Sequence, residues 1–198
     1  MISSTHNHST GSDGEFTPEE LVKKAISLNW DYIYFTDHYT THPDINTTFG
    51  KTFFSKDYLN EIKRLKLKYQ DKIKIYFGVE LDWLEEYKDW HKKKIKKYDF
   101  DYILGSIHRL KYKEGHRGME KGKDYWIESA KIFGGVKKYI QEYYKQIRLI
   151  IKSGIYDAIG HLDYIKIYNK KGDLFNENED WYKKEILKGL DLIKKHNL

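Results

Sequence analysis

The segment Ile73–Leu81, IKIYFGVEL, is rich in β-branched and aromatic residues, and it predicts a buried β-strand that ends beside Glu80. On its N-terminal side, Lys56–Tyr69 carries apolar residues at helical spacing. On its C-terminal side, a short polar helix is expected at Lys88–Lys97, followed by a second β-like run at Tyr102–Ile107. Helices that separate successive strands are typical of an α/β fold with a parallel sheet.

The same alternation continues towards the N-terminus. Two further strands are expected, at Ile2–His8 and Asp31–Asp37. Between them Thr17 is a helix N-cap, Pro18 suits the first helical position and Glu20 completes a capping box.

Towards the C-terminus, Lys111–Trp126 is polar and aperiodic and is expected to be a long loop. Val136–Ser153 predicts a strong amphipathic helix that Gly154 ends. A strand is expected at Tyr156–Gly160 and a last helix at Glu179–His196. The two candidate architectures are a β/α barrel and a doubly wound sheet.

Composition indicates a single domain over residues 1–198. Hydrophobic residues make up 39% of the chain, and only two prolines occur, so nothing marks a linker. No apolar run is long enough to span a bilayer, and the absence of cysteine fits a cytoplasmic protein. The net charge of +6 comes from scattered residues, which indicates solvated helix faces or, alternatively, a surplus that attracts anionic substrates, and no nucleic-acid partner.

Each expected strand ends near a histidine or a glutamate. In a parallel α/β fold the carboxyl ends of the strands meet at one face. One such histidine is more often a structural residue, but five strand ends together indicate a metal site for Zn²⁺, Mn²⁺ or Fe²⁺. The residues are His6 and His8, His38, Glu80, His108 and His161. Asp13, in the turn before the first helix, is either a turn residue or a further ligand.

Several other residues are candidates for substrate contact. Arg109 is either a phosphate clamp or an exposed loop residue, and Lys166 is a weaker candidate. Arg117 and His116 could line a substrate mouth, and Trp83 could pack against substrate or fill the barrel rim. The three histidines without a strand-end position are interpreted as surface residues: His42, His91 and His196.

These residues also form a family pattern. His6-Asn7-His8-Ser9 with Ser12-Asp13-Gly14 resembles the first motif of the PHP (polymerase and histidinol phosphatase) family. Thr36-Asp37-His38 resembles the second motif, and Glu80 in GVEL with His108 in GSIH resembles the third. Gly160-His161-Leu162-Asp163 is similar to the histidinol-phosphatase branch, and the resemblance covers nearly the whole chain.

The resemblance implies a distorted (β/α)7 TIM-like barrel with two or three divalent metal ions. By the family pattern, His6, His8 and Glu80 would bind one ion, and Glu80, His108 and His161 a second. Asp13 and His38 would contribute to a third, and Asp37 would orient a ligand in the catalytic centre.

One motif of the family has no counterpart in the sequence. The family closes with a Gly-Ser-Asp-Ala-His type of motif on its last strand, whereas this chain ends at Leu198 after a helix. We therefore expect a barrel that is incomplete at its C-terminal end, in either a fragment or a shortened member. The first ion would lose a carboxylate and the third a histidine.

The expected function is a metal-dependent phosphomonoesterase acting on histidinol phosphate in histidine biosynthesis. A small phosphate ester is the expected partner, without nucleic acid or membrane, and the oligomeric state is left open. One alternative is a PHP phosphoesterase for another small phosphate or a nucleotide, because the Ser12-Asp13-Gly14 turn has the general PHP form. The other is an inactive, metal-binding remnant.

Overall fold

The computed structural model describes residues 2–39, 54–113 and 115–198. The chain forms two compact units. The first comprises residues 1–81 and 90–104, and the second comprises residues 82–89 and 105–198. Whether the chain is a single domain over 1–198 stays a prediction.

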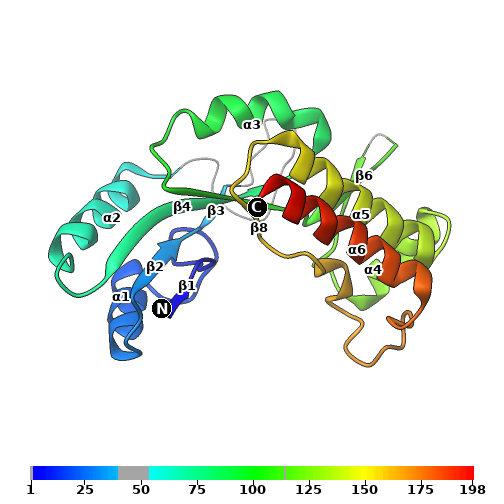
Figure 1. The fold of residues 1–198 in the computed structure, drawn as a ribbon, viewed down its shortest axis with the longest axis horizontal. Coiled ribbons are helices and arrows are strands. Elements are labelled where there is room, and N and C mark those ends of the chain that lie inside the picture. Colours follow the sequence, from blue (N-terminus) through cyan, green and yellow to red (C-terminus); the bar gives the residue numbers. More distant parts are fainter. Residues whose placement is uncertain (1, 40–53, 114) are drawn as a thin grey trace. The chain divides into compact units, whose positions relative to one another are not determined.

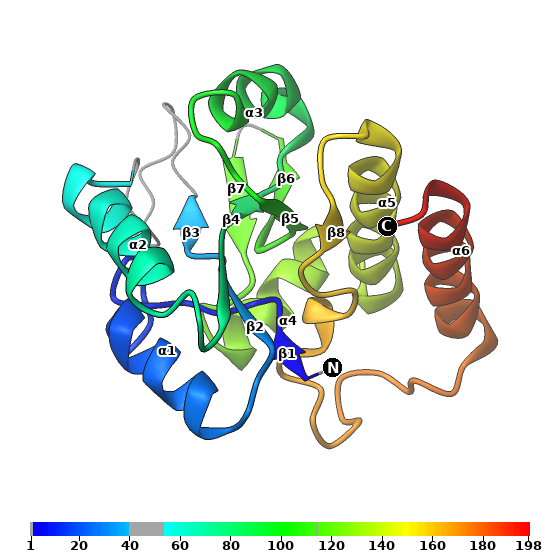
Figure 2. The same cartoon turned by 60° about the vertical axis from the view of Figure 1, so that its left-hand side comes forward.

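The first unit contains a parallel sheet with helices α1 and α2 side by side (Figures 1 and 2). Its hydrogen-bonded strands follow the order β1-β2-β4-β5, and β3 pairs with β4. The elements are β1 (Ser3–Ser4), α1 (Pro18–Ser27), β2 (Tyr32–Phe35), β3 (His38–Tyr39), α2 (Lys56–Lys68), β4 (Lys74–Asp82), α3 (Lys88–Ile95) and β5 (Tyr102–Ser106), of which β4, α3 and β5 have end residues in the second unit.

The predicted helix start at Thr17 is confirmed. The Thr17 side chain accepts a hydrogen bond from the Glu20 backbone, and the Glu20 carboxylate accepts one from the Thr17 backbone. On the sheet, Ile33, Phe35 and Ile75 are buried, and in β2 the buried residues alternate with half-buried residues because successive side chains of a strand point to opposite faces. Strands β2 and β4 pair in parallel from Tyr32 with Lys74 to Phe35 with Phe77, so their carboxyl ends point in the same direction.

The second unit has three long helices, α4 to α6, of which α5 and α6 lie side by side (Figures 1 and 2). The amide of Gly160 donates to the carbonyl of Gly105, which joins β8 to the end of β5. The elements are η1 (Glu85–Tyr87), β6 (Arg109–Tyr112), β7 (Gly115–Gly118), α4 (Lys123–Ile132), α5 (Val136–Ser153), β8 (Ala158–Ile159), η2 (Tyr164–Lys166) and α6 (Asp180–His196).

The predicted helix at Val136–Ser153 is confirmed as α5, and Gly154 ends it with a positive φ of 63°. The predicted loop at Lys111–Trp126 is wrong. Its first part belongs to an antiparallel hairpin in which Leu110 pairs with Arg117, and its last part begins α4. The hairpin escaped prediction because its strands are largely polar, and α4 because Gly122 provides no side-chain cap.

The interpretation of His91 as a surface residue is also wrong, because its side chain is buried. His91 lies on the inward stripe of α3, which the many lysines of this helix conceal in the sequence. His196 is exposed, as predicted, and His42 lies outside the described residues.

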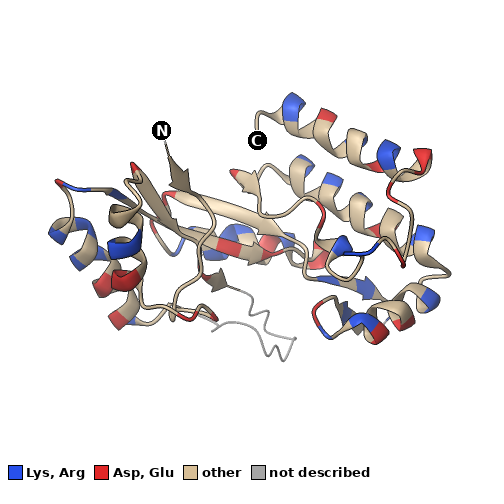
Figure 3. Ribbon diagram, turned by 90° about the horizontal axis from the view of Figure 1, so that it is seen from below, with Lys and Arg blue, Asp and Glu red and all other residues tan. Residues whose placement is uncertain are grey.

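Figure 3 shows that positions of Lys and Arg and positions of Asp and Glu are both spread over the helices. Within the described parts of the chain, no helix combines the length and the apolar character that crossing a bilayer requires.

Candidate metal centre

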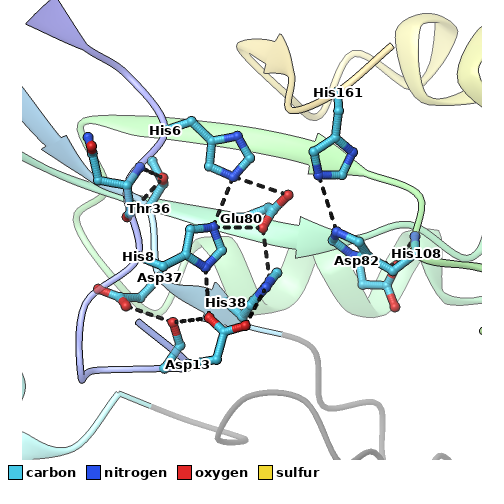
Figure 4. A network of polar contacts seen from close by, with 12 residues as sticks. His6, His8, Asp13, Thr36, Asp37, His38, Glu80, Asp82, His108 and His161 are labelled. Carbon is cyan, nitrogen blue, oxygen red and sulfur yellow. Dashed lines mark hydrogen bonds and ion pairs between the residues drawn. The ribbon is translucent and has the colours of Figure 1, made fainter. Parts of the chain in front are cut away.

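Glu80 is the centre of the first unit's site. It lies in β4 and is fully buried, and the parallel register of β3 on β4 places His38 directly beside it. The Nδ1 atom of His38 is 2.9 Å from Oε2 of Glu80. His6 and His8 approach from the chain that follows β1: Nε2 of His6 is 3.3 Å from Oε1, and Nε2 of His8 is 3.2 Å from Oε2 (Figure 4).

The distances in this cluster fit a divalent cation. The two Nε2 atoms of His6 and His8 face each other at 2.9 Å. Zinc–nitrogen bonds of about 2.0–2.1 Å place two ligands of a tetrahedral ion about 3.3 Å apart. The separations between the two imidazoles and the Glu80 carboxylate are close to that value. A borderline-soft cation such as Zn²⁺ suits this mixture of nitrogen and oxygen donors.

Asp13 joins the same cluster from the turn before α1. Its Oδ1 atom is 3.0 Å from Nδ1 of His8, and its Oδ2 atom is 3.5 Å from Nε2 of His38. One donor atom from each of these three residues lies within 4.8 Å of the other two. This group is therefore a second set of potential ligands in the first unit.

The carboxylates determine the protonation of His8. Burial lowers the pKa of His8, but hydrogen bonds and charges from Glu80 and then Asp13 outweigh it and raise the pKa above the ordinary value. Burial correspondingly raises the pKa of Asp13, while the charge of His38 and the hydrogen bond of His8 lower it overall. Both shifts have the direction expected when carboxylates lie beside imidazoles, because each favours the charged form of the other.

Asn7 holds the two histidines that flank it. Its backbone amide donates to Oγ1 of Thr36 at 3.0 Å, and the Thr36 amide donates to its carbonyl at 3.0 Å. The Asn7 side chain donates to the carbonyl of Tyr34 at 2.8 Å. Strand β1 ends before His6, so these bonds, rather than a long strand, fix the chain that carries His6 and His8.

Asp37 is fully buried behind the cluster. Its carboxylate accepts hydrogen bonds from the Ser9 amide at 2.7 Å, the Ser9 hydroxyl at 2.9 Å and the Ser12 hydroxyl at 2.7 Å. The Tyr58 hydroxyl is a further donor. Asp37 therefore organises residues 9–14, the turn that carries Asp13.

The second unit contributes a separate pair of imidazoles. Nε2 of His108 is 3.3 Å from Nε2 of His161, again the spacing of two ligands on one ion (Figure 4). The ring of Tyr164 stacks on His161 with centroids 4.5 Å apart. The buried Tyr143 hydroxyl donates to the His161 carbonyl at 3.1 Å, which fixes the backbone at this position.

Asp82 is a functional candidate that sequence reasoning missed. Its Oδ1 atom accepts the His108 amide at 3.1 Å and is 3.4 Å from Nδ1 of the same residue. Burial raises the pKa of Asp82, but the His108 hydrogen bond and the nearby charges lower it overall, so the carboxylate stays ionised. The signal was the spacing Glu80-x-Asp82, which places both side chains on one side of a strand.

The remaining sequence candidates have partners within the second unit. Nε of Arg109 donates to Asp82 at 2.6 Å. Arg117 pairs with Glu128, and Lys166 with Glu177, both at 2.8 Å. His116 is 2.9 Å from Glu86, and Trp83 is buried with its indole donating to Gln146. Trp83 therefore fills the interior of this unit. Substrate contact by Arg109, Arg117 and Lys166 stays a prediction.

Comparison with known proteins identifies the family. Residues 4–198 match the model of the PHP domain. A protein of Clostridium acetobutylicum named "probable histidinol-phosphatase" is 31% identical over 195 residues, covering 95% of this chain and 68% of that protein. The histidinol-phosphatase of Lactococcus lactis is 27% identical, covering 88% of this chain and 62% of that protein.

Solved structures show the same fold. A histidinol-phosphatase-like protein of Listeria monocytogenes superposes with a TM-score of 0.86 at 19% identity, over 99% of this chain and 80% of the other. The Lactococcus lactis enzyme was solved with zinc, L-histidinol and phosphate. It superposes with a TM-score of 0.72 at 23% identity, over 98% of this chain and 70% of the other.

The chain is an α/β protein with the curled parallel sheet of an incomplete TIM-like barrel, which confirms the predicted fold class. It belongs to the PHP domain family. It spans 68% of the length of the Clostridium acetobutylicum relative and 62% of the Lactococcus lactis relative.

Proposed function

We propose that this chain is a metal-dependent phosphomonoesterase whose substrate is histidinol phosphate. The observation that carries the proposal is the convergence of three imidazoles on the buried Glu80 carboxylate, at 2.9 to 3.3 Å. Its similarity to proteins named histidinol-phosphatase, one of them 31% identical, supports the choice of substrate.

The ligands follow from the two clusters. His6, His8 and Glu80 bind one divalent ion, and Asp13 and His38 contribute to a neighbouring one. His108 and His161 supply the ligand pair of the second unit. That Glu80 also joins His108 and His161 stays a prediction from the family pattern. Zinc is the first choice of metal because a related structure contains it, and manganese and iron suit the same donors.

A bound divalent ion lowers the pKa of a coordinated water and offsets the charge that builds up on phosphoryl oxygens. The chain's own residues prepare its ligands. Asp82 holds His108 at the Nδ1 side, so that Nε2 is the ligand atom. Asp13 does the same for His8, leaving Nε2 of His8 directed at Glu80. The chain has no cysteine, and hydrolysis by water needs no covalent phosphoenzyme.

Arg109 is the candidate phosphate clamp. Its side chain is 11% exposed, and Asp82 fixes its Nε atom. A guanidinium held by one edge can offer its remaining N–H groups to phosphate oxygens in a defined direction. Lys166 and Arg117 are weaker candidates, because their ion pairs already occupy the terminal nitrogens, Nζ of Lys166 and Nη2 of Arg117, whereas Arg109 is paired through Nε.

The test is phosphate release from histidinol phosphate by protein that is stripped with chelator and then reloaded with Zn²⁺ or Mn²⁺. We expect activity only after reloading, and a loss of at least about 100-fold in His108→Ala. The control is His196→Ala, because His196 is exposed at the end of α6. Equal activity in stripped and reloaded protein, or an unaffected His108→Ala, would contradict the proposal.

A substrate panel separates the alternatives. Activity that favours another small phosphate or a nucleotide would keep the phosphoesterase and replace the substrate. Metal binding without release from any phosphate ester would show a metal-binding remnant.

A further inference from the structure

We propose that Tyr58 of α2 is a positioning residue for the metal centre, and that it acts by locking the turn of residues 9–14 through Asp37. This inference rests on the proposed metal site and, in its activity readout alone, on the proposed phosphatase function. The structural relationship itself lies entirely within the first unit.

The hydroxyl of Tyr58 donates to a buried carboxylate, that of Asp37, which accepts three further hydrogen bonds. Asp37 already accepts bonds from Ser9 and Ser12, and the Tyr58 hydroxyl donates to its Oδ2 atom. Burial and the charge of Asp37 raise the pKa of Tyr58 well above its usual range, so the hydroxyl remains a donor at physiological pH. Hydrogen bonds from Ser9, Ser12 and Tyr58 hold this buried carboxylate in one orientation.

The ring of Tyr58 touches the turn directly. A β-carbon placed on Gly11 would lie 2.3 Å and 2.7 Å from two ring carbons of Tyr58. Glycine is therefore required at position 11 by the close approach of this ring. Tyr58 therefore contacts the turn in two ways. Its ring packs against Gly11, and its hydroxyl donates to the Asp37 carboxylate, which accepts hydrogen bonds from Ser9 and Ser12.

The connection reaches the metal donors through Ser12. Its hydroxyl is 2.7 Å from Oδ1 of Asp37 and 3.3 Å from Oδ1 of Asp13. Asp13 is in turn 3.0 Å from Nδ1 of His8. A displacement of Asp37 would thus be transmitted to Asp13 and to the ring of His8.

Contacts with Ser55 and Phe54 fix the position of Tyr58 itself. Its backbone amide donates to the Ser55 hydroxyl that caps α2, at 3.1 Å. Its ring stacks on Phe54 with centroids 5.1 Å apart. Groups that orient metal ligands from behind commonly change metal affinity or activity by about 10–100-fold when they are removed.

The experiment compares Tyr58→Phe with Tyr69→Phe. Tyr69 follows the same helix and donates to Glu19 at 2.8 Å, so it loses an equivalent hydroxyl away from the centre. Zinc affinity is measured by chelator competition, and amide hydrogen exchange is followed for residues 9–14. We expect Tyr58→Phe to weaken zinc binding about 10-fold, to speed exchange in the turn, and to regain activity at high zinc concentration. Tyr69→Phe should leave all three unchanged.

Ser12→Ala is a second variant for the case that Tyr58→Phe gives little folded protein. It removes the hydroxyl that lies between Asp37 and Asp13 and leaves the buried ring of Tyr58 in place. It should weaken zinc binding in the same direction. Unchanged zinc affinity and unchanged exchange in Tyr58→Phe would overturn the proposal, as would an activity loss that excess zinc does not restore. If the unaltered protein lacks phosphatase activity, the proposed function fails, whereas zinc affinity and exchange still decide the role of Tyr58.

Discussion

Asp82 contacts His108 at two atoms: its carboxylate accepts a hydrogen bond from the His108 backbone amide at 3.1 Å and lies 3.4 Å from Nδ1 of the His108 ring. The opposite ring nitrogen then faces Nε2 of His161 at 3.3 Å. A carboxylate behind an imidazole fixes both its tautomer and its direction, a common arrangement at metal sites in proteins. The relationship suggests that Asp82 contributes to metal binding without itself binding metal.

Asp82→Asn should therefore lower metal affinity by about 10–100-fold, because the amide keeps the shape but loses the charge that supports the His108 ring. Chelator competition measures the affinity. Asp173→Asn is the control, since Asp173 pairs with Lys123 on the surface of the same unit. Equal metal affinities of the two variants would show that Asp82 does not contribute to metal binding.

Glu80→Gln should have a larger effect on metal binding in the first unit. The carboxylate is buried among His6, His8 and His38, and an amide cannot supply its charge to a cation. We expect a loss beyond the roughly 100-fold seen for supporting residues. Metal content after gel filtration, determined by mass spectrometry, is the readout, and full retention of metal would speak against Glu80 as a ligand.

Gly14→Ala should destabilise the protein by about 1–3 kcal/mol, the usual cost of inserting atoms into a closely packed region. A β-carbon there would lie 2.2 Å from the carbonyl oxygen of His8, which is backbone and cannot rotate away. Gly115→Ala is the matched control, because a β-carbon at Gly115 meets nothing within 4 Å. Urea denaturation measures both, and similar midpoints would contradict the prediction.

Glu185 should make stability depend on acid pH. Burial raises the pKa of this carboxyl, but hydrogen bonds from Lys188 and Arg148 outweigh burial and lower the pKa below its ordinary value of 4.5. Its stabilisation is therefore present above the unfolded pKa and is lost as pH falls through the folded one. At pH 7, Glu185→Gln should lower the free energy of unfolding by about 1–3 kcal/mol.

The difference between Glu185→Gln and the unaltered protein should shrink as the pH is lowered below about 4.5. Denaturant titrations at several pH values provide the measurement. Glu142→Gln is a control for the loss of a carboxylate, because its pair with Lys145 is more exposed and worth about 1 kcal/mol or less. A pH-independent difference for Glu185→Gln would show that its charge is unimportant.

The sequence predicted those features that local chemistry dictates. The Thr17 capping box and the apolar stripe of Val136–Ser153 are local signals, and α1 and α5 formed where these signals placed them. The strand expected at Ile73–Leu81 is found at full length as β4, Lys74–Asp82. The strand expected at Ile2–His8 is shortened to Ser3–Ser4, because the hydrogen bonds of Asn7 replace strand pairing after β1 ends.

Features that depend on tertiary neighbours were harder to predict. The helical spacing within Lys56–Tyr69 places Tyr58 on the apolar side of a helix, but the sequence does not show that its hydroxyl contacts Asp37. The spacing of Asp82 from Glu80 indicates a shared side of the strand, but the sequence does not show that the partner of Asp82 is His108, 26 residues further along the chain. His91 appeared exposed among lysines, although its position on α3 buries it.

The most direct test of the account is an anomalous difference map from crystals of the zinc-loaded protein. The account predicts a peak about 2.0–2.1 Å from Nε2 of both His6 and His8, with a Glu80 oxygen at about 2.0–2.2 Å. Zinc bound only at other histidines, or no peak at this cluster in fully loaded crystals, would contradict it.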